Sequence, residues 1–282
     1  MAESFKRYAR VFDPTSKEPH KISRSKIDFF LECPRCFYLS ERLGIKRPST
    51  APFTLNVAVD FLLKKEFDIH RAKGTPHPLM KSYRVKAKPF QHKNIDSWRE
   101  NFVGIRFLHV KTNLLITGAV DDVWIGEAGK LHVVDYKATA KDGVVDKLED
   151  TRWHNQYRRQ IEVYQWLLRM NGFDTSDTGY FVYVNGKKDR KAFDGKLEFD
   201  VALITYTGNS SWVDGVLLQI KDCLMSGAIP VVGELCEFCP YRTSAGKALL
   251  QNFGLKKSTP EKRNNTINEK QSTHEDQNQS LF

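Results

Sequence analysis

The segment that decides the fold is Gly118-Ala-Val-Asp121-Asp122-Val123, followed after nine residues by Val133-Val134-Asp135-Tyr136-Lys137. Both parts are rich in β-branched residues, and the Gly-Glu-Ala-Gly-Lys sequence at 126–130 forms a turn between them, so the pattern predicts two adjacent strands. Residues two apart in a strand share a face. Asp135 and Lys137 should therefore point the same way and Tyr136 the other way, with Asp121 close by on the neighbouring strand.

This set of side chains suits phosphodiester hydrolysis. Such a reaction uses a divalent cation, held by oxygen ligands, to lower the pKa of a water molecule. The carboxylates of Asp121 and Asp135 and the carbonyl of Tyr136 are ligands of that kind, and Lys137 would orient the nucleophile or offset developing charge. Asp122 competes with Asp121 for the role. Surface charges or a simple salt bridge are the alternative, although the apolar Val133-Val134 argues for a buried strand end, where unused charges are costly.

Periodicity and capping signals predict the elements around this segment. A helix should begin at Ser23 or Ser25 and stop at Gly44, and a second helix fits residues 55 to about 71. The predicted strands are 105–110, 114–125, 131–138, 179–184 and 197–205, and two further helices are 154–171 and 211–226. This order predicts an α/β fold with a central mixed β-sheet flanked by helices.

The length of 282 residues predicts one large domain. We expect a flexible polar segment at 1–20, a folded domain at 21–245 and a disordered polar tail at 246–282, because the C-terminal composition has almost no apolar residues. A net charge of +10 suits a nucleic-acid partner, although a basic tail on any protein would give the same sum.

The sequence has neither the apolar segments of a membrane or secreted protein nor the phosphate-binding motif of an ATP-driven helicase. The chain has no apolar run of bilayer-spanning length, and its N-terminus lacks the apolar core of a secretory signal, so we expect a cytoplasmic protein with no membrane partner. It has no Gly-x-x-x-x-Gly-Lys-Ser/Thr phosphate loop, so any helicase that acts with it is a separate protein.

A third motif lies on the predicted helix 154–171. Gln160 and Tyr164 are four residues apart and therefore share a helix face. The three motifs together, in this order, resemble the PD-(D/E)XK nuclease superfamily, in particular its RecB-like branch: Gly118-x-x-Asp121, Asp135-x-Lys137 and Gln160-x-x-x-Tyr164.

The resemblance implies a restriction-endonuclease-like core and a role for each motif residue. Asp121 and Asp135 would bind Mg²⁺ or Mn²⁺, Lys137 would assist the attacking water or the transition state, and Gln160 and Tyr164 would position substrate and catalytic groups. Relatives often carry a further histidine ligand on an upstream helix, where this chain has Asp60. Aspartate binds the same ions, so Asp60 is either the missing ligand or a surface charge on the helix.

Four of the five cysteines form two Cys-x-x-Cys pairs, Cys33/Cys36 and Cys236/Cys239. In a reducing compartment such pairs hold metal more often than disulfides. Four thiolates suit zinc or an iron–sulfur cluster. A resemblance to AddB-type and CRISPR-associated exonucleases favours a 4Fe–4S cluster. Those relatives use one cysteine before the core and three after it, whereas this chain has two before and two after. Zn²⁺ is therefore the alternative. We expect a structural clamp, and Cys223 should be a core residue.

A basic and aromatic run precedes Gln160 and is a candidate DNA-binding surface: Arg152, Trp153, Tyr157, Arg158 and Arg159. Such residues grip phosphates and stack unpaired bases, although a solvated helix start has the same composition. The sequence thus predicts a metal-dependent DNA nuclease, an exonuclease acting on single strands or ends. DNA repair, recombination and CRISPR adaptation are the candidate settings, with a helicase or a recombination or CRISPR protein as a candidate partner. The alternative is a catalytically impaired nucleic-acid-binding module of the same fold.

Overall fold

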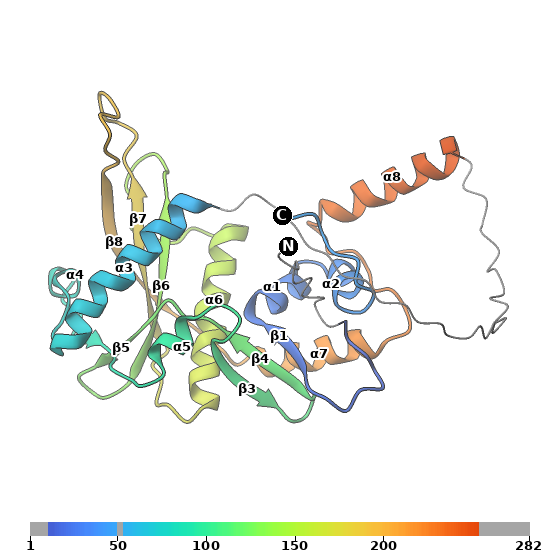
Figure 1. Cartoon of the computed structure of the whole chain (residues 1–282), viewed down its shortest axis with the longest axis horizontal. Coiled ribbons are helices and arrows are strands. Elements are labelled where there is room, and N and C mark those ends of the chain that lie inside the picture. The colour runs from blue at the N-terminus through green and yellow to red at the C-terminus, as the bar shows by residue number, and fades with distance from the viewer. Residues whose placement is uncertain (1–10, 50–52, 254–282) are drawn as a thin grey trace, which may run out of the picture. The chain divides into compact units, whose positions relative to one another are not determined.

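The computed structural model describes residues 11–49 and 53–253. The chain divides into two compact units, Met1–Cys239 and Pro240–Phe282. The first unit contains two sheets (Figure 1). The smaller has the order β1 (His20–Ser23), β4 (Leu114–Gly118), β3 (Ile105–His109). The larger has the order β2 (Ala87–Pro89), β5 (Asp122–Gly126), β6 (Leu131–Thr139), β7 (Thr178–Gly186), β8 (Phe199–Thr207).

Both sheets are mixed. Strand β1 is parallel to β4, and β6 is parallel to β7, whereas every other neighbouring pair is antiparallel. The predicted α/β class, with mixed sheets flanked by helices, is therefore confirmed. The prediction of one central sheet was too simple, because the expected strand at 114–125 is interrupted after Gly118 and its two halves, β4 and β5, belong to different sheets.

Contacts from distant helices cause this interruption. A side chain at Gly118 would place its Cβ 2.5 Å from Cε1 of Tyr164, so only glycine allows the helix to approach here. The Tyr164 hydroxyl donates to the carbonyl of Ala119 (2.6 Å), and the N–H of Val120 donates to the carbonyl of Trp98 (3.1 Å). Since these contacts take the place of sheet pairing, Asp121 lies in the gap between two strands.

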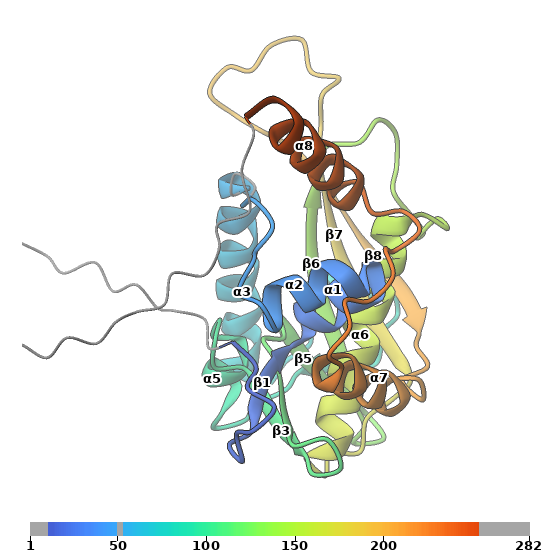
Figure 2. The ribbon, with the colours of Figure 1, turned by 90° about the vertical axis from the view of Figure 1, so that its right-hand side faces the viewer.

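Two long helices cover opposite faces of the larger sheet, as Figure 2 shows: α3 (Thr54–Lys73) and α6 (Arg152–Met170). Alternate residues of β6 enter the two cores. Val134 and Tyr136 pack on the α3 side with Phe67, whereas Val133 packs on the α6 side. Two short helices, α4 (Pro78–Ser82) and α5 (Ile95–Arg99), follow α3. The larger sheet therefore carries Asp135 on its α6 face.

The predicted N-terminal helix is two helices, α1 (Arg24–Glu32) and α2 (Pro34–Glu41). Ser23 caps α1 by accepting a hydrogen bond from the N–H of Lys26. Cys33 separates the helices with an extended backbone (φ −158°), because the proline at position 34 disfavours helical geometry in the residue before it. This break places Cys33 and Cys36 at the start of α2.

The two ends of the chain differ from the sequence-based prediction. From residue 11 the N-terminal segment is attached more firmly than expected, since Phe12 is buried and its N–H donates to the carbonyl of Glu41. After α7 (Val213–Met225), helix α8 (Phe238–Phe253) continues beyond the predicted boundary at 245, because residues 246–253 include helix-forming Ala and Leu. The rest of the predicted tail lies outside the described residues.

Among the described residues, no helix combines the length and the apolar character needed to cross a membrane.

Candidate active site

Asp121 is held against strand β6 at the point where the β5–β6 pairing ends. The last pair in the ladder is Asp122 with Val134. Beyond it, the N–H of Tyr136 donates to Oδ2 of Asp121 at 2.9 Å. A residue's N–H and C=O point to the same edge of a strand. The Tyr136 carbonyl therefore faces the edge that Asp121 occupies, and its side chain lies on the opposite face of the sheet from Lys137.

Asp135 is completely buried and pairs with the ammonium group of Lys137. This ion pair lacks hydrogen-bond alignment, and neither carboxylate oxygen of Asp135 has a hydrogen-bond donor among the described residues. Burial raises the pKa of Asp135 to about 7; Lys137 opposes the shift and the nearby Asp121 adds to it. A buried carboxylate whose oxygens accept no hydrogen bond, beside a second carboxylate, fits a site for a divalent cation that binds oxygen ligands. Asp121, Asp135 and the Tyr136 carbonyl are the groups that could hold it.

Asp60 lies beside these carboxylates. It is half-buried on α3, and the ammonium group of Lys64 lies 2.7 Å from Asp60 and 3.7 Å from Asp121. Burial raises the pKa of Asp60, the charge of Asp121 raises it further, and Lys64 opposes both. Glu66, one turn and a half further along α3, bonds to His77 instead. Of the three acidic groups on α3, Asp60 is thus the one placed to complete the cation site, since Asp68 pairs with Arg71 and Arg99.

Gln160 and Tyr164 connect the lysine to the strand break. Oε1 of Gln160 accepts from Lys137 at 3.4 Å, and its Nε2 donates to the Tyr164 hydroxyl at 3.3 Å. That hydroxyl in turn donates to the carbonyl of Ala119, two residues before Asp121. All three motifs of the sequence therefore meet in one hydrogen-bonded chain, from β6 through α6 to the end of β4.

Two hollows in the surface meet at Asp121. The first, here called the α3 hollow, has a volume of about 500 Å³ and lies between α3, the end of β6 and the start of α6. The second, the β4 hollow, has a volume of about 340 Å³ and lies between β4 and the start of α1. Four residues line both: Arg24, Asn101, Asp121 and Gln160. Asp60 and Lys137 line the α3 hollow and Asp121 lines both hollows, so these three groups face open space, whereas Asp135 is completely buried and lines neither hollow.

The family model of the PD-(D/E)XK nuclease superfamily matches residues 58–244, about two thirds of the chain. The chain belongs to this superfamily. Among solved structures, the one titled "Crystal structure of SSO0001" is similar, with 16% sequence identity and a TM-score of 0.36 over 81% of this chain and 86% of that chain. No protein with curated annotation matches.

Members of the PD-(D/E)XK superfamily are generally nucleases, which bind nucleic acid and use divalent metals. When bound, such an ion lowers the pKa of a water molecule and offsets charge on the phosphate. This chain's own groups supply the rest. Asp121 and Asp135 present oxygens at one edge of β6, and the Lys137 ammonium group is held by Asp135, by Gln160 and by the ring of Tyr157, 4.7 Å from the ring centre. A lysine fixed this way can orient or protonate an oxygen at the reacting phosphate.

Groups of the protein itself occupy the carboxylate of Asp122. It is fully buried in this PD-(D/E)XK domain, and five groups bind its carboxylate: the side chains of Arg71, Arg99, Tyr136 and Trp124 and the N–H of Val123. A carboxylate so fully bonded to the protein has no lone pair directed at the hollows. The structure therefore favours Asp121 over its neighbour.

Lys64 and Arg24 were missed by the sequence-based prediction. The four-residue spacing from Asp60 to Lys64 was a usable signal, because residues at i and i+4 pair on a helix. Nothing in the sequence connected Arg24 to the site, since it lies far from the motifs in the chain and enters the hollows through the packing of α1.

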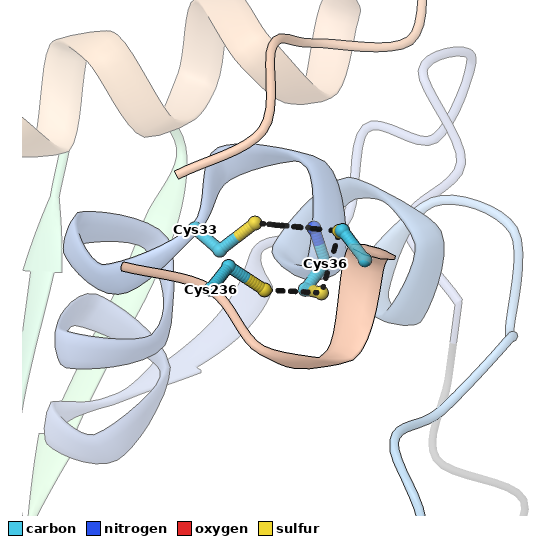
Figure 3. Close-up of side chains that lie close together, drawn as sticks. Cys33, Cys36 and Cys236 are labelled. Carbon is cyan, nitrogen blue, oxygen red and sulfur yellow. Dashed lines mark hydrogen bonds between the residues drawn. The ribbon is translucent and has the colours of Figure 1, made fainter. Parts of the chain in front are cut away.

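The four clustered cysteines come from the start of α2, where Cys33 is the N-cap and Cys36 is in the first turn, and from the start of α8, where Cys236 precedes the helix and Cys239 is its second residue. All four are buried, and their sulfur atoms lie within 4.8 Å of one another. Figure 3 shows Cys33, Cys36 and Cys236 converging. The N–H groups of Cys36 and Gly233 donate to the Cys33 sulfur, and the Arg47 guanidinium donates to the sulfur of Cys236. This set could hold a metal ion. Cys223 lies apart from it on α7, half-buried.

The predicted DNA-binding run does not form a single surface. The Tyr157 ring lies in the α3 hollow beneath Lys137. Arg158 donates to the carbonyl of Leu148, and Arg159 donates to the buried Asp28, so both have structural partners. Arg152, which pairs with Glu32, and the exposed Trp153 line a third hollow with Asp28 and Arg159. Because an α-helix has about 3.6 residues per turn, residues of this run that are adjacent in the sequence point to different faces of α6.

Lys64 should compete with a metal ion for Asp60 and Asp121. We expect Lys64→Gln to bind Mn²⁺ more tightly than the wild type, by roughly tenfold in Kd, because one nearby positive charge is removed. Isothermal titration with Mn²⁺ measures this. Lys65→Gln is the matched control, since Lys65 contacts the ring of the exposed Phe61. Equal or weaker Mn²⁺ binding by Lys64→Gln would contradict the expectation.

Proposed function

We propose that this protein is a metal-dependent deoxyribonuclease, a phosphodiester hydrolase that acts as an exonuclease on single strands or ends. The observation that carries the proposal is the position of Asp121 at the junction of two open hollows, with Lys137 lining one of them and the buried Asp135 paired with Lys137. Asp121, Asp135, Asp60 and the Tyr136 carbonyl would hold Mg²⁺ or Mn²⁺. Lys137 would act on the nucleophile or the leaving oxygen, and Gln160 and Tyr164 would position it.

Single-stranded DNA is the proposed substrate form because the α3 hollow offers ring surfaces beside its charges. Phe53 and Tyr157 line this hollow together with Lys137 and Arg24. Rings stack on unpaired bases and cations bind the backbone, which is the usual combination for single strands. The exposed Trp153, with Arg152, would extend that path along the start of α6. The net charge of +10 supports a polyanionic partner.

The biological setting follows from the resemblance to the RecB-like branch. We propose a role in DNA repair, recombination or CRISPR adaptation, in the cytoplasm, with a helicase or a recombination or CRISPR protein as a separate partner. The four buried, unpaired cysteines are compatible with a reducing compartment.

One observation favours the second candidate, a catalytically impaired nucleic-acid-binding module. Lys64 bridges Asp60 and Asp121 where a cation would sit. If this ion pair excluded the metal, the hollows would still bind a strand without cleaving it.

For the cysteine site we propose a single zinc ion. Zinc–sulfur bonds of about 2.3 Å in a tetrahedron place the sulfur atoms about 3.8 Å apart. The Sγ separations are 3.8 Å for Cys33–Cys239, 3.6 Å for Cys36–Cys236 and 3.3 Å for Cys36–Cys239. A 4Fe–4S cluster, which the resemblance favoured, inserts a cage of eight atoms between the thiolates and needs wider spacing. The distances therefore support the zinc alternative.

A cleavage assay tests the proposed function. End-labelled single-stranded, double-stranded and circular DNA would be incubated with the wild type and with Lys137→Ala, in Mn²⁺ and in EDTA. We expect Mn²⁺-dependent shortening of linear single strands by the wild type alone. Equal cleavage by both proteins, or none with Mn²⁺, would sink the enzyme proposal; strand binding without cleavage would favour the impaired module.

Metal analysis and a visible spectrum test the cysteine site. We expect a colourless protein with one zinc per chain. A brown protein absorbing near 400 nm, on the order expected for sulfur-to-iron charge transfer, would replace the zinc with a cluster.

A further inference from the structure

Arg24, the first residue of α1, occupies the junction of the two hollows. Of the four residues that line both, it carries the only positive charge; Asn101, Asp121 and Gln160 are the others. It belongs to none of the three motifs, and its side chain is about one fifth exposed. A cation placed where two hollows join, beside a hydrolytic site, is positioned to meet any strand that passes from one to the other.

The buried Asp28 holds Arg24 in this place. Asp28 is 3% exposed and accepts hydrogen bonds from Arg24 (2.9 Å) and from Arg159 of α6 (2.6 Å). Among the described residues, Asp28 is the one hydrogen-bond partner of the Arg24 side chain. The guanidinium group has five N–H donors, so its remaining donors are available on the side of the hollows.

The other lining of the β4 hollow favours an anion. Lys21 and the hydroxyl groups of Ser23 and Ser25 line it with Arg24, and its one acidic residue is Asp121. Asp121 is the group that a bound divalent ion would neutralise. The hollow thus has two cationic residues and several hydroxyl-bearing residues in its lining against a single acidic residue.

We propose that Arg24 binds a phosphate of the substrate strand next to the phosphate that is cleaved, and that Asp28 is the positioning residue that orients it. The proposal rests on the proposed nuclease function. A guanidinium group presents a rigid, planar fork that pairs with two phosphate oxygens, and an ammonium group does not. Prior orientation by a buried carboxylate lowers the entropy lost when the strand binds.

Arg24→Gln and Arg24→Lys test the contact, with Arg169→Lys as the matched control. Arg169 is also a carboxylate-paired arginine, bonded to Asp177 at the far end of α6. We expect Arg24→Gln to lower kcat/KM for a single-stranded oligonucleotide roughly 10- to 100-fold, as for loss of a charge-assisted hydrogen-bonded pair, and Arg24→Lys to restore only part of this. Arg169→Lys should cleave like the wild type. Full activity of Arg24→Gln would overturn the proposal.

A second measurement separates a phosphate contact from a merely structural role. Methylphosphonate linkages, which carry no charge, would replace single phosphates on either side of the cleaved bond. We expect one such replacement to slow the wild type and leave Arg24→Gln unaffected, because the interaction is already lost. If every replacement slows both proteins equally, Arg24 does not touch a phosphate. Arg24→Lys gives the same comparison should Arg24→Gln melt below the assay temperature.

Oligonucleotides with and without terminal phosphates distinguish the source of the bound group. A loss of kcat/KM by Arg24→Gln that persists on hydroxyl-ended strands indicates an internal phosphate, as we propose. A loss confined to phosphate-ended strands overturns that assignment in favour of an end-binding subsite.

Binding of the same strands, measured by fluorescence anisotropy in EDTA, keeps the inference separate from the nuclease proposal. If the wild type binds but does not cleave in Mn²⁺, the proposed function fails, while weaker binding by Arg24→Gln still supports the contact.

Discussion

At pH 8 without divalent metal, Asp135→Asn should be more stable than the wild type, and with Mn²⁺ it should have lost cleavage. Burial raises the pKa of Asp135 from 3.8 to about 7 in the folded protein. The folded state therefore holds this proton more tightly than the unfolded chain does. Its contribution to stability is complete below pH 3.8 and is lost as the pH rises through about 7. Asparagine resembles the protonated acid and does not lose that contribution.

The expected gain is on the order of 4 kcal/mol at pH 8, since the shift from 3.8 to about 7 spans about three pKa units and each unit corresponds to about 1.4 kcal/mol. Loss of a metal ligand should slow cleavage on the order of 1,000-fold, which corresponds to about 4 kcal/mol of transition-state stabilisation. Thermal denaturation in EDTA from pH 5 to 8, and single-turnover cleavage in Mn²⁺, measure the two effects. Mn²⁺ should raise the melting temperature of the wild type and not that of the variant.

Glu162→Gln is the matched control for this experiment. Glu162 is also a buried acid of the larger core, but it accepts hydrogen bonds from Tyr206, Trp212 and the N–H of Asn209. We expect its replacement to destabilise the protein at every pH, because bonded donors lose a charged acceptor. A lower stability of Asp135→Asn than of the wild type at pH 8 would show that Asp135 is a structural partner of Lys137 and not a metal-binding group.

The second large effect is expected at the cysteine cluster. Cys36→Ser should lower the melting temperature by roughly 10 °C or more, which for a domain of this size corresponds to about 4 kcal/mol. The cluster joins segments 200 residues apart in the sequence, so it closes a very long loop of the unfolded chain. A metal ion held by the four buried sulfur atoms would add its binding free energy to the stability of the fold. A strong zinc chelator should have the same effect on the wild type.

Cys223→Ser provides the comparison for Cys36→Ser. Cys223 is half-buried on α7, outside the cluster, and burial raises its pKa to about 11, so it is a neutral thiol at physiological pH. Its replacement should change the melting temperature little. Below the transition, folded Cys36→Ser should still cleave, because no cysteine lines the α3 or β4 hollow. Selective loss of cleavage by a fully folded Cys36→Ser protein would give the cluster a catalytic role instead.

Local periodicity explains what could be predicted from the sequence. The alternation along β6 placed Asp135 and Lys137 on one face and Tyr136 on the other, because side-chain direction in a strand depends only on residue spacing. The four-residue spacing of Gln160 and Tyr164 placed both on one face of α6 for the same reason. The cysteine pairs were recognisable because each pair lies within a few residues.

Long-range contacts explain what could not be predicted. The break between β4 and β5 depends on Tyr164 and Trp98, which are far from Ala119 in the chain, so the segment 114–125 read as one strand. The burial of Asp122 depends on Arg71 and Arg99 in two other helices. The Gly-x-x-Asp spacing favoured Asp121 over Asp122 only through the resemblance to a family, and the partners that arrive from elsewhere in the fold supply the physical difference between the two carboxylates.

That distinction gives the most direct test of the account: single-turnover Mn²⁺-dependent cleavage by Asp121→Asn and Asp122→Asn, with melting temperatures measured alongside. Asp121→Asn should melt within a few degrees of the wild type, since asparagine still accepts from Tyr136, and its cleavage should fall on the order of 1,000-fold. Asp122→Asn should lose about 3–5 kcal/mol of stability because two buried arginines lose their charged partner, yet its folded fraction should cleave within about tenfold of the wild-type rate. Wild-type cleavage by Asp121→Asn, or its loss from folded Asp122→Asn alone, would contradict the assignment of this site.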